Sequence, residues 1–261
     1  MDRLLDEKQR NDLFIPVSGF DGKRYVCRRT HGMIKTENLT KVYNGVTAVN
    51  SINIEVGKGQ VCGFVGSNGA GKTTTLGMMI GLIQPTEGKC FIKNIEVSRH
   101  PLAVKQIIGY LPDGVGFYHR MNAVQNLRFL SKFYGLNDAD ANRRISELLE
   151  YVGLAKVVKK VGTYSKGMKQ RLGLARTLLN DPEVIFLDEP TNGLDPEGVI
   201  QFRNIVKEQA AADKTVFFPR TCSMRCSTYA IPFASSRKVG SWLKGRWKTS
   251  VKVSARNNAS Q

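Results

Sequence analysis

Eight consecutive residues, Gly66 to Thr73, have the residue types and the spacing of a loop that binds phosphate groups. They read GSNGAGKT and fit the pattern G-x-x-x-x-G-K-[ST]. In such a loop, glycines let backbone N–H groups converge on phosphate oxygens, and the following helix N-terminus adds partial positive charge. Lys72 then reaches the outer phosphates, and the Thr73 hydroxyl ligates Mg²⁺. The residues expected to contact the phosphate-bearing ligand are Gly66, Ser67, Asn68, Gly69, Ala70, Gly71, Lys72, Thr73 and Thr74.

Two adjacent carboxylates, Asp188 and Glu189, follow an apolar segment at 184–187 that is typical of a buried strand. Adjacent carboxylates at such a strand end are costly unless a positive charge lies nearby, and Mg²⁺ would supply it. Asp188 is therefore a candidate metal ligand. Glu189 is a candidate catalytic residue that positions an attacking water, with Lys72 as the second one. A solvent-exposed turn before Pro190 is the alternative, and the phosphate loop argues against it.

The elements that must position these residues alternate between strands and helices. Apolar or alternating residues predict strands over 34–43, 48–56, 60–66, 89–95, 107–111, 184–188 and 215–218. Apolar residues three and four apart predict helices over 71–83, 122–136, 138–154, 167–180 and 196–212. This order predicts an α/β fold with a parallel sheet and an inserted helical block. The strand and helix flanking the phosphate loop supply the context that the motif requires, whereas chance alone produces the pattern on the order of 1% of the time.

Composition excludes several other classes of protein. A chain of 261 residues with 41% hydrophobic residues can bury one sizeable core. The longest nearly unbroken apolar run, residues 76–83, is far shorter than the ~20 residues that cross a bilayer. The first ten residues lack the apolar core of a secretion signal, so we expect a cytoplasmic protein. Five cysteines without a C-x-x-C pair favour reduced thiols over disulfides or a zinc site.

The net charge of +17 is unevenly distributed along the chain. Residues 214–261 carry 10 Lys and Arg and no Asp or Glu. A nucleic-acid arm is usually denser in Lys and Arg than this segment, which is diluted with Ser, Trp, Phe and Cys. The charge distribution therefore argues against nucleic acid as a partner.

Two further motifs complete a recognisable set. Residues 164–171 read YSKGMKQR, and residues 191–196 read TNGLDP. With the phosphate loop and the Asp188–Glu189 pair, they resemble the ATP-binding subunit of ABC transporters over residues 33 to about 218. The YSKGM variant of the LSGGQ motif resembles the exporter-type branch. The resemblance implies a P-loop NTPase core with a mainly parallel sheet, a small antiparallel β subdomain and an inserted helical subdomain at about 113–180.

The same resemblance implies that the ligand is ATP with Mg²⁺ and that ATP is hydrolysed to ADP and phosphate. It assigns Tyr43 to stacking on adenine, although alone it would be read as a half-buried strand residue. Ser165 and Gly167 match residues that contact the γ-phosphate bound by the opposite subunit, and Asp195 matches a loop linking the two sites. A head-to-tail homodimer is therefore expected, held to the inner face of the cell membrane by a separate membrane-spanning permease.

The sequence departs from the family at two places. Asp113 stands where the family has a glutamine that senses Mg²⁺; its carboxylate can still ligate the metal, and we expect altered coupling to the permease. After residues 215–218 the family reads S-S-H, with a histidine that contacts the γ-phosphate, whereas this chain reads Pro219, Arg220 and Thr221. The missing histidine predicts impaired hydrolysis.

A single missing nucleotide after the codon for Phe218 explains the second departure better than substitution by Thr221. Read one base out of register, the codons that follow permit Ser, Ser and His, then Leu, Glu, Val, Cys, Asp and Val at the family's spacing. We therefore expect a flexible extension at 1–32, the ATP-binding domain at 33–218, and an aberrant basic tail at 219–261 that is disordered or poorly packed. Two other functions stay open: a soluble ABC-type ATPase acting on nucleic acid or ribosomes, and a product that binds ATP but hydrolyses it poorly.

Overall fold

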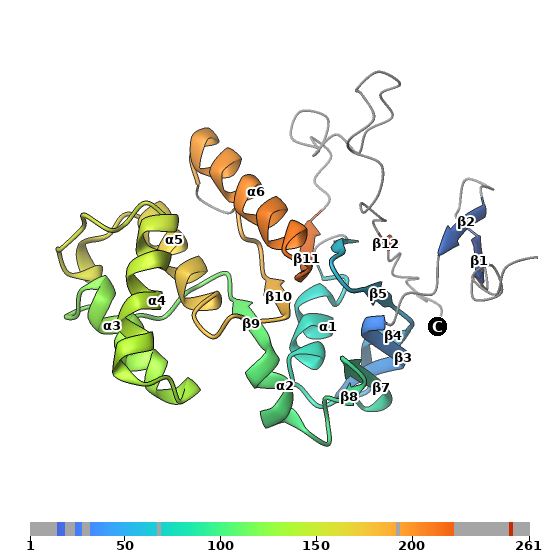
Figure 1. Cartoon of the computed structure of the whole chain (residues 1–261). Helices are drawn as coiled ribbons and strands as arrows, with labels where there is room; N and C mark the ends of the chain where they lie inside the picture. The colour runs from blue at the N-terminus through green and yellow to red at the C-terminus, as the bar shows by residue number, and fades with distance from the viewer. Residues whose placement is uncertain are drawn as a thin grey trace, which may run out of the picture.

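The computed structural model describes residues 15–18, 24–27, 32–66, 69–191, 194–221 and 251–252. One of its sheets is parallel throughout, with the strand order β12-β6-β11-β10-β9 (Figure 1). The strands are β6 (Val61–Gly66), β9 (Ile108–Leu111), β10 (Val184–Leu187), β11 (Thr215–Thr221) and β12 (Val251–Lys252). Because all five run the same way, their carboxyl ends share one edge, where the phosphate loop and the Asp188–Glu189 pair follow.

Both faces of the parallel sheet are covered. The helices beside it are α1 (Lys72–Met79), α2 (Pro101–Ile107), α5 (Lys166–Thr177) and α6 (Pro196–Ala211). Along β10, Val184 and Phe186 belong to a core cluster shared with α1 and α2, while Ile185 and Leu187 belong to a second cluster shared with α5 and α6. This alternation follows from the two-residue period of a strand, and it explains why β10 is apolar at all four positions.

A second sheet is antiparallel and packs on α1. Its strands are β3 (Gly32–Tyr43), β4 (Val46–Ile52), β5 (Glu55–Gly57), β7 (Glu87–Ile92) and β8 (Ile95–Glu96). The hairpin between β3 and β4 turns at Asn44 and Gly45, whose φ values of 46° and 81° suit a two-residue turn. Two strands nearer the N-terminus, β1 (Ile15–Ser18) and β2 (Arg24–Cys27), pair antiparallel with each other.

Three helices form the inserted block. They are α3 (Ala123–Ser131), α4 (Asp138–Tyr151) and α5, joined by 3-10 turns at Lys132–Tyr134 and Val161–Thr163. Side chains cap each N-terminus: Asn122 forms a capping box with Gln125, Asn137 caps α4, and Ser165 caps α5. In Figure 1, α3 and α4 lie at the end of the molecule farthest from the antiparallel strands.

The α/β fold with its parallel sheet, antiparallel strands and helical insertion is confirmed, and the differences concern element boundaries and one short helix. The helix predicted over 71–83 ends at Met79, before Gly81, whose φ is 72°. The strand predicted over 48–56 is divided into β4 and β5. The short helix α2 was not predicted from the sequence; Pro101 begins it at a position where a missing N–H costs nothing.

The structure describes the regions around the predicted domain limits only in part. Strand β11 continues to Thr221, three residues past the predicted limit at Phe218. Of the predicted extension at 1–32, the structure describes only β1, β2 and Gly32. Of the predicted tail at 219–261, it describes only the end of β11 and β12, and the remaining residues of both segments lie outside the described part of the chain. Among the helices that the structure describes, none has the length and apolar character needed to cross a membrane.

Candidate functional site

The phosphate loop joins the end of β6 to the start of α1, and glycine is required where it meets the helix. Gly71 precedes α1 with φ of 75°. A Cβ placed on Gly71 would lie 2.3 Å from the carbonyl oxygen of Ala48, so the loop passes directly against the backbone of β4. Gly69 also has a positive φ, of 79°. Ser67 and Asn68 lie outside the described residues.

Lys72 lies over the loop that precedes it. Its side chain is buried, and Nζ donates a hydrogen bond to the carbonyl oxygen of Gly66 at 3.2 Å. Thr73 is exposed at the helix start, while Thr74 is half-buried. The buried Thr75 hydroxyl donates to the carbonyl oxygen of Gly71 at 2.8 Å, which fastens the first turn of α1 to the loop.

The two carboxylates sit at the same sheet edge as Lys72. Asp188 is only 7% exposed. Burial raises the pKa of its carboxyl, the nearby Glu189 and Asp113 raise it further, and Lys72 opposes them. The pKa of Tyr110 on β9 is also raised, first by burial and then by Asp188 and Asp113. Lys72, Glu189 and Asp113 therefore all lie close enough to Asp188 to act on its carboxyl group.

The backbone of Glu189 takes an unusual conformation. Its φ is 44°, in the left-handed region that non-glycine residues rarely adopt. On the residue before it, the Asp188 N–H donates to the carbonyl oxygen of Leu111 at 2.8 Å. On the residue after it, the carbonyl oxygen of Pro190 accepts a hydrogen bond of 3.0 Å from Nε2 of the buried Gln170. The turn is thus held from both sides.

The other two motifs form adjacent helix N-termini. The Ser165 hydroxyl accepts from the Met168 N–H at 3.2 Å and caps α5. The Asp195 carboxylate accepts from the Gly198 N–H at 2.8 Å and caps α6. A Cβ placed on Gly167 would lie 3.7 Å from Cδ2 of Leu194, so the two helix starts touch.

Within the described part of the chain, no contact joins Ser165 or Gly167 to the phosphate loop of the same chain. The structure therefore brings together two separate groups of predicted residues. One group contains the phosphate loop and the carboxylates, and the other contains the residues at the starts of α5 and α6.

Tyr43 lies at the end of β3, beside the hairpin turn. Its side chain is 43% exposed, and Nζ of Lys41 lies 5.0 Å from the ring centroid. A cation over one ring face leaves an aromatic surface suited to stacking. The hairpin also reaches the phosphate loop, because Ala48 on β4 abuts Gly71.

A divalent cation would need phosphate oxygens to complete its shell. Although Glu189 and Asp113 act electrostatically on Asp188, no three His, Cys, Asp or Glu side chains among the residues described lie close enough together to hold a metal ion by themselves. Mg²⁺ commonly takes one or two protein oxygens and fills its remaining positions with phosphates and waters. The buried Asp188, with two further carboxylates raising its pKa, fits a role beside such a cation.

Three features of the site were not predicted from the sequence: the hydrogen bond from Gln170, the backbone conformation of Glu189, and the position of Tyr110. Gln170 stands inside the YSKGMKQR motif, so its position was visible, but its partner lies twenty residues away. Tyr110 precedes Leu111 on a predicted strand without any motif of its own.

Comparison with known proteins adds independent support. Residues 49–192 match the family model described as ABC transporter. The chain is 43% identical over 187 residues to the bacitracin transport ATP-binding protein BcrA of Bacillus licheniformis, covering 71% of this chain and 60% of that one. It is 39% identical over 175 residues to the ABC transporter ATP-binding protein NatA of Bacillus subtilis, covering 66% and 71%. The chain thus spans less than two thirds of the bacitracin relative's length.

Solved structures give the same result. The ATP-binding subunit of an ABC transporter superposes with a TM-score of 0.67 at 27% identity, covering 72% of this chain and 79% of that one. A dimeric ATP-binding cassette bound to ADP and Pi superposes with a TM-score of 0.66 at 26% identity, covering 72% and 87%. Motifs, fold and relatives agree: the chain belongs to the ABC transporter family.

Proposed function

We propose that this chain is the ATP-binding and ATP-hydrolysing subunit of an ABC transporter that exports a solute through a separate permease at the inner face of the cell membrane. The observation that carries the proposal is the convergence of Lys72 with Asp188 and Glu189 at the carboxyl edge of the parallel sheet. The names of the bacitracin relative and of the linearmycin resistance ATP-binding protein LnrL of Bacillus subtilis support export of a harmful compound.

The proposed roles follow from position. The loop from Gly66 to Thr74 surrounds the phosphates with backbone N–H groups, and Lys72 neutralises charge on the outer two. Tyr43 stacks on the adenine. Thr73, Asp188 and Asp113 are the residues that would hold Mg²⁺, whose charge stabilises the phosphate oxygens during transfer.

Glu189 is the proposed catalytic carboxylate. It follows Asp188 at the sheet edge and is half-buried, so it can accept a hydrogen bond from a water at the end of the phosphate chain. That water attacks the γ-phosphorus in line, the bond to the β-phosphate oxygen breaks, and the water's proton passes towards the carboxylate. ADP and phosphate are the products.

A second copy of the chain is the proposed partner in this reaction. The starts of α5 and α6 place Ser165, Gly167 and Asp195 side by side, away from their own phosphate loop. A helix N-terminus favours anions, so a γ-phosphate held by another subunit suits the start of α5. The similarity to a dimeric cassette bound to ADP and Pi supports a head-to-tail homodimer.

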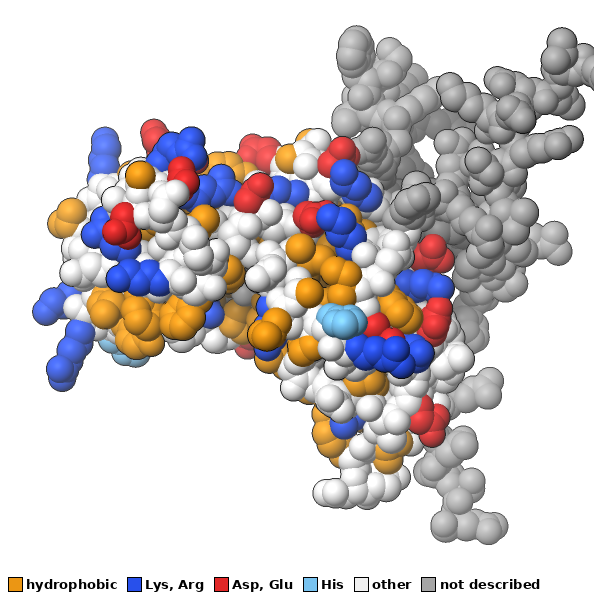
Figure 2. Space-filling model, turned by 60° about the horizontal axis from the view of Figure 1, so that its bottom comes forward, with side chains coloured by type: hydrophobic (Ala, Val, Ile, Leu, Met, Phe, Trp, Pro, Cys, Tyr) orange, Lys and Arg blue, Asp and Glu red, His pale blue; other side chains and the backbone are white. Residues whose placement is uncertain are grey.

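The proposed permease contact lies on the helical insertion. Tyr118, Phe129 and Phe133 stack edge to face, with centroids 4.9 and 5.3 Å apart, and Phe133 is 73% exposed. Figure 2 shows hydrophobic side chains gathered on this part of the surface, beside Lys and Arg side chains. Exposed aromatic clusters of this kind are typical of protein interfaces.

We further propose that hydrolysis is slow, because the chain departs from the family beside the phosphate loop. The backbone of Thr221 pairs with Gly66, the first residue of that loop, so this position of β11 adjoins the nucleotide phosphates. The family's histidine is replaced there. The out-of-frame reading of residues 219–261 stays our hypothesis for this change, and the nucleotide sequence across codon 218 tests it.

Phosphate release by the purified chain tests the proposed activity. We expect the wild type to exceed Glu189→Gln, and Thr221→His to exceed the wild type. A fluorescent ATP analogue should bind the Glu189→Gln variant normally but bind Lys72→Met at least tenfold more weakly, as the loss of one charge-assisted phosphate contact implies. Equal rates for wild type and Glu189→Gln would instead support a product that only binds ATP. Stimulation by RNA or ribosomes would favour the soluble ATPase.

A further inference from the structure

We infer that Gln170 is a positioning residue for Glu189: it fixes the catalytic turn to the helix whose N-terminus faces the partner subunit. The inference rests on the proposed function for the role of Glu189. Its structural basis is the 3.0 Å hydrogen bond from Nε2 of Gln170 to the carbonyl oxygen of Pro190.

The chemistry of the turn explains why this bond matters. Pro190 has no N–H to donate, and the residue before it holds a left-handed φ of 44° that costs free energy. Such a conformation persists only when its surroundings determine it. The Gln170 side chain is only 6% exposed. Leaving a buried amide donor without an acceptor costs free energy, so the hydrogen bond favours the position of the turn in which the Pro190 carbonyl oxygen accepts it.

The same helix contacts the far end of the loop. A Cβ on Gly167 would lie 3.7 Å from Cδ2 of Leu194, and Asp195 then begins α6. Helix α5 therefore contacts the segment from Pro190 to Leu194 at both ends. Ser165 caps the N-terminus of α5, and Gln170 lies on the same helix. A γ-phosphate that the partner subunit brings to Ser165 therefore acts on the helix that holds the catalytic turn.

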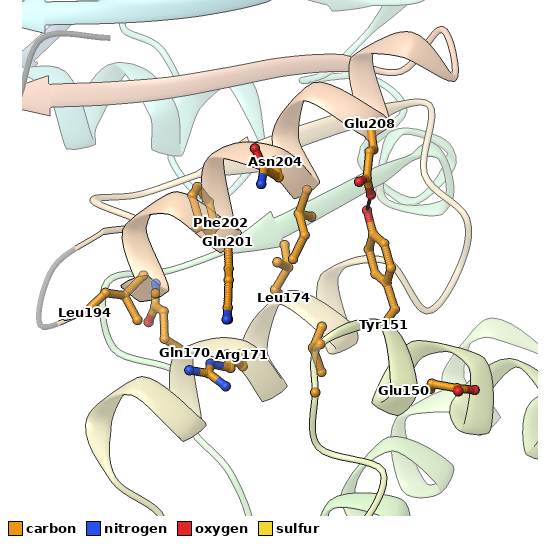
Figure 3. A pocket seen from close by; sticks show the side chains of 14 residues that line it. Glu150, Tyr151, Gln170, Arg171, Leu174, Leu194, Gln201, Phe202, Asn204 and Glu208 are labelled. Carbon is orange, nitrogen blue, oxygen red and sulfur yellow. Dashed lines mark hydrogen bonds between the residues drawn. The ribbon is translucent and has the colours of Figure 1, made fainter. Parts of the chain in front are cut away.

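Apolar side chains of a shared core cluster join α5 and α6, and hydrogen bonds lie at both ends of the groove beside them. A groove of about 420 Å³ opens between the end of α4, α5 and α6. Figure 3 shows Gln170 and Leu194 together at the N-terminal end of α6, and the Tyr151 hydroxyl hydrogen-bonded to Glu208 at the other end. The Gln170 hydrogen bond lies at one end of this groove and links α5 directly to the catalytic turn.

The test replaces Gln170 with methionine, which has similar length but no N–H donor. We expect kcat for ATP hydrolysis to fall on the order of 10- to 100-fold, the range for small misplacement of a catalytic group, while KM for ATP changes less than about twofold. The matched control is Gln201→Met. Gln201 lines the same groove, but its amide donates to Glu197 on its own helix. This control should keep wild-type kcat and KM.

Amide hydrogen exchange supplies a readout that does not require turnover. In Gln170→Met, peptides covering 188–195 should exchange faster than in the wild type, while peptides covering β3 exchange at the wild-type rate. Two outcomes for Gln170→Met would overturn the inference. One is an unchanged kcat, and the other is a change in kcat, KM and melting temperature together. A wild-type rate no higher than that of Glu189→Gln counts against the proposed hydrolysis instead, and exchange at 188–195 then decides whether Gln170 holds the turn.

Discussion

Replacing Glu189 with asparagine should make the protein more stable while abolishing hydrolysis. Glu189 holds φ at 44°, a conformation that costs an ordinary L-residue about 1–2 kcal/mol. Asparagine is several-fold enriched in this region because its short side chain can hydrogen-bond locally, which corresponds to about 0.5–1 kcal/mol of relief. The loss of a carboxylate beside the buried Asp188 removes repulsion as well.

Glu189→Gln separates the two effects. It removes the charge but keeps a side chain with no preference for the left-handed region, so any stability that Asn gains over Gln comes from the backbone. For a domain of this size, 1 kcal/mol shifts the melting temperature by roughly 2–4 °C. We therefore expect Asn to melt about 1–4 °C above Gln.

Differential scanning calorimetry of the wild type and both variants, without nucleotide, measures this difference. Circular dichroism should show the same fold in all three, and phosphate release should be lost equally in both variants. An Asn variant that melts at or below the Gln variant would refute the claim that the turn is strained at this residue.

Three other outcomes test separate parts of the structure. Gly71→Ala should lower the free energy of unfolding by more than about 2 kcal/mol in urea titrations and abolish binding of an ATP analogue, because its Cβ would lie 2.3 Å from the oxygen of Ala48 at a positive φ. Burial raises the pKa of Cys62 and of Cys90 to about 12, so with the other cysteines changed to serine a thiol reagent at pH 8 should react only after unfolding. Tyr43→Ala should raise the dissociation constant for ATP about tenfold and Tyr43→Phe should not, as equilibrium binding would show.

The fold was predictable because its signals are local. The apolar run at 184–187 and the glycine pattern before Lys72 identify a buried strand and a strand-loop-helix unit without knowledge of distant residues. The family resemblance supplied the antiparallel subdomain, which the pattern of residues alone did not distinguish from the main sheet.

The rest depends on contacts between distant segments. Gln170 is an ordinary polar residue of an amphipathic helix until the fold brings Pro190 to its amide. The left-handed φ of Glu189 cannot be predicted from a residue type that rarely adopts it. The end of α1 at Met79 comes just before the positive φ of Gly81, where an added Cβ would lie 3.2 Å from Cγ1 of Val97.

The position of β11 determines the order in which the sheet can be completed during folding. Among the strands that the structure describes, β11 is the last long one along the chain, yet it pairs with both β6 and β10 and separates them. Until it is synthesised, two apolar strands of the parallel sheet keep open edges, which are templates for pairing with other chains. Parallel pairing across so much sequence is also slow to form. Aggregation during synthesis should therefore depend on how quickly the chain through Thr221 leaves the ribosome.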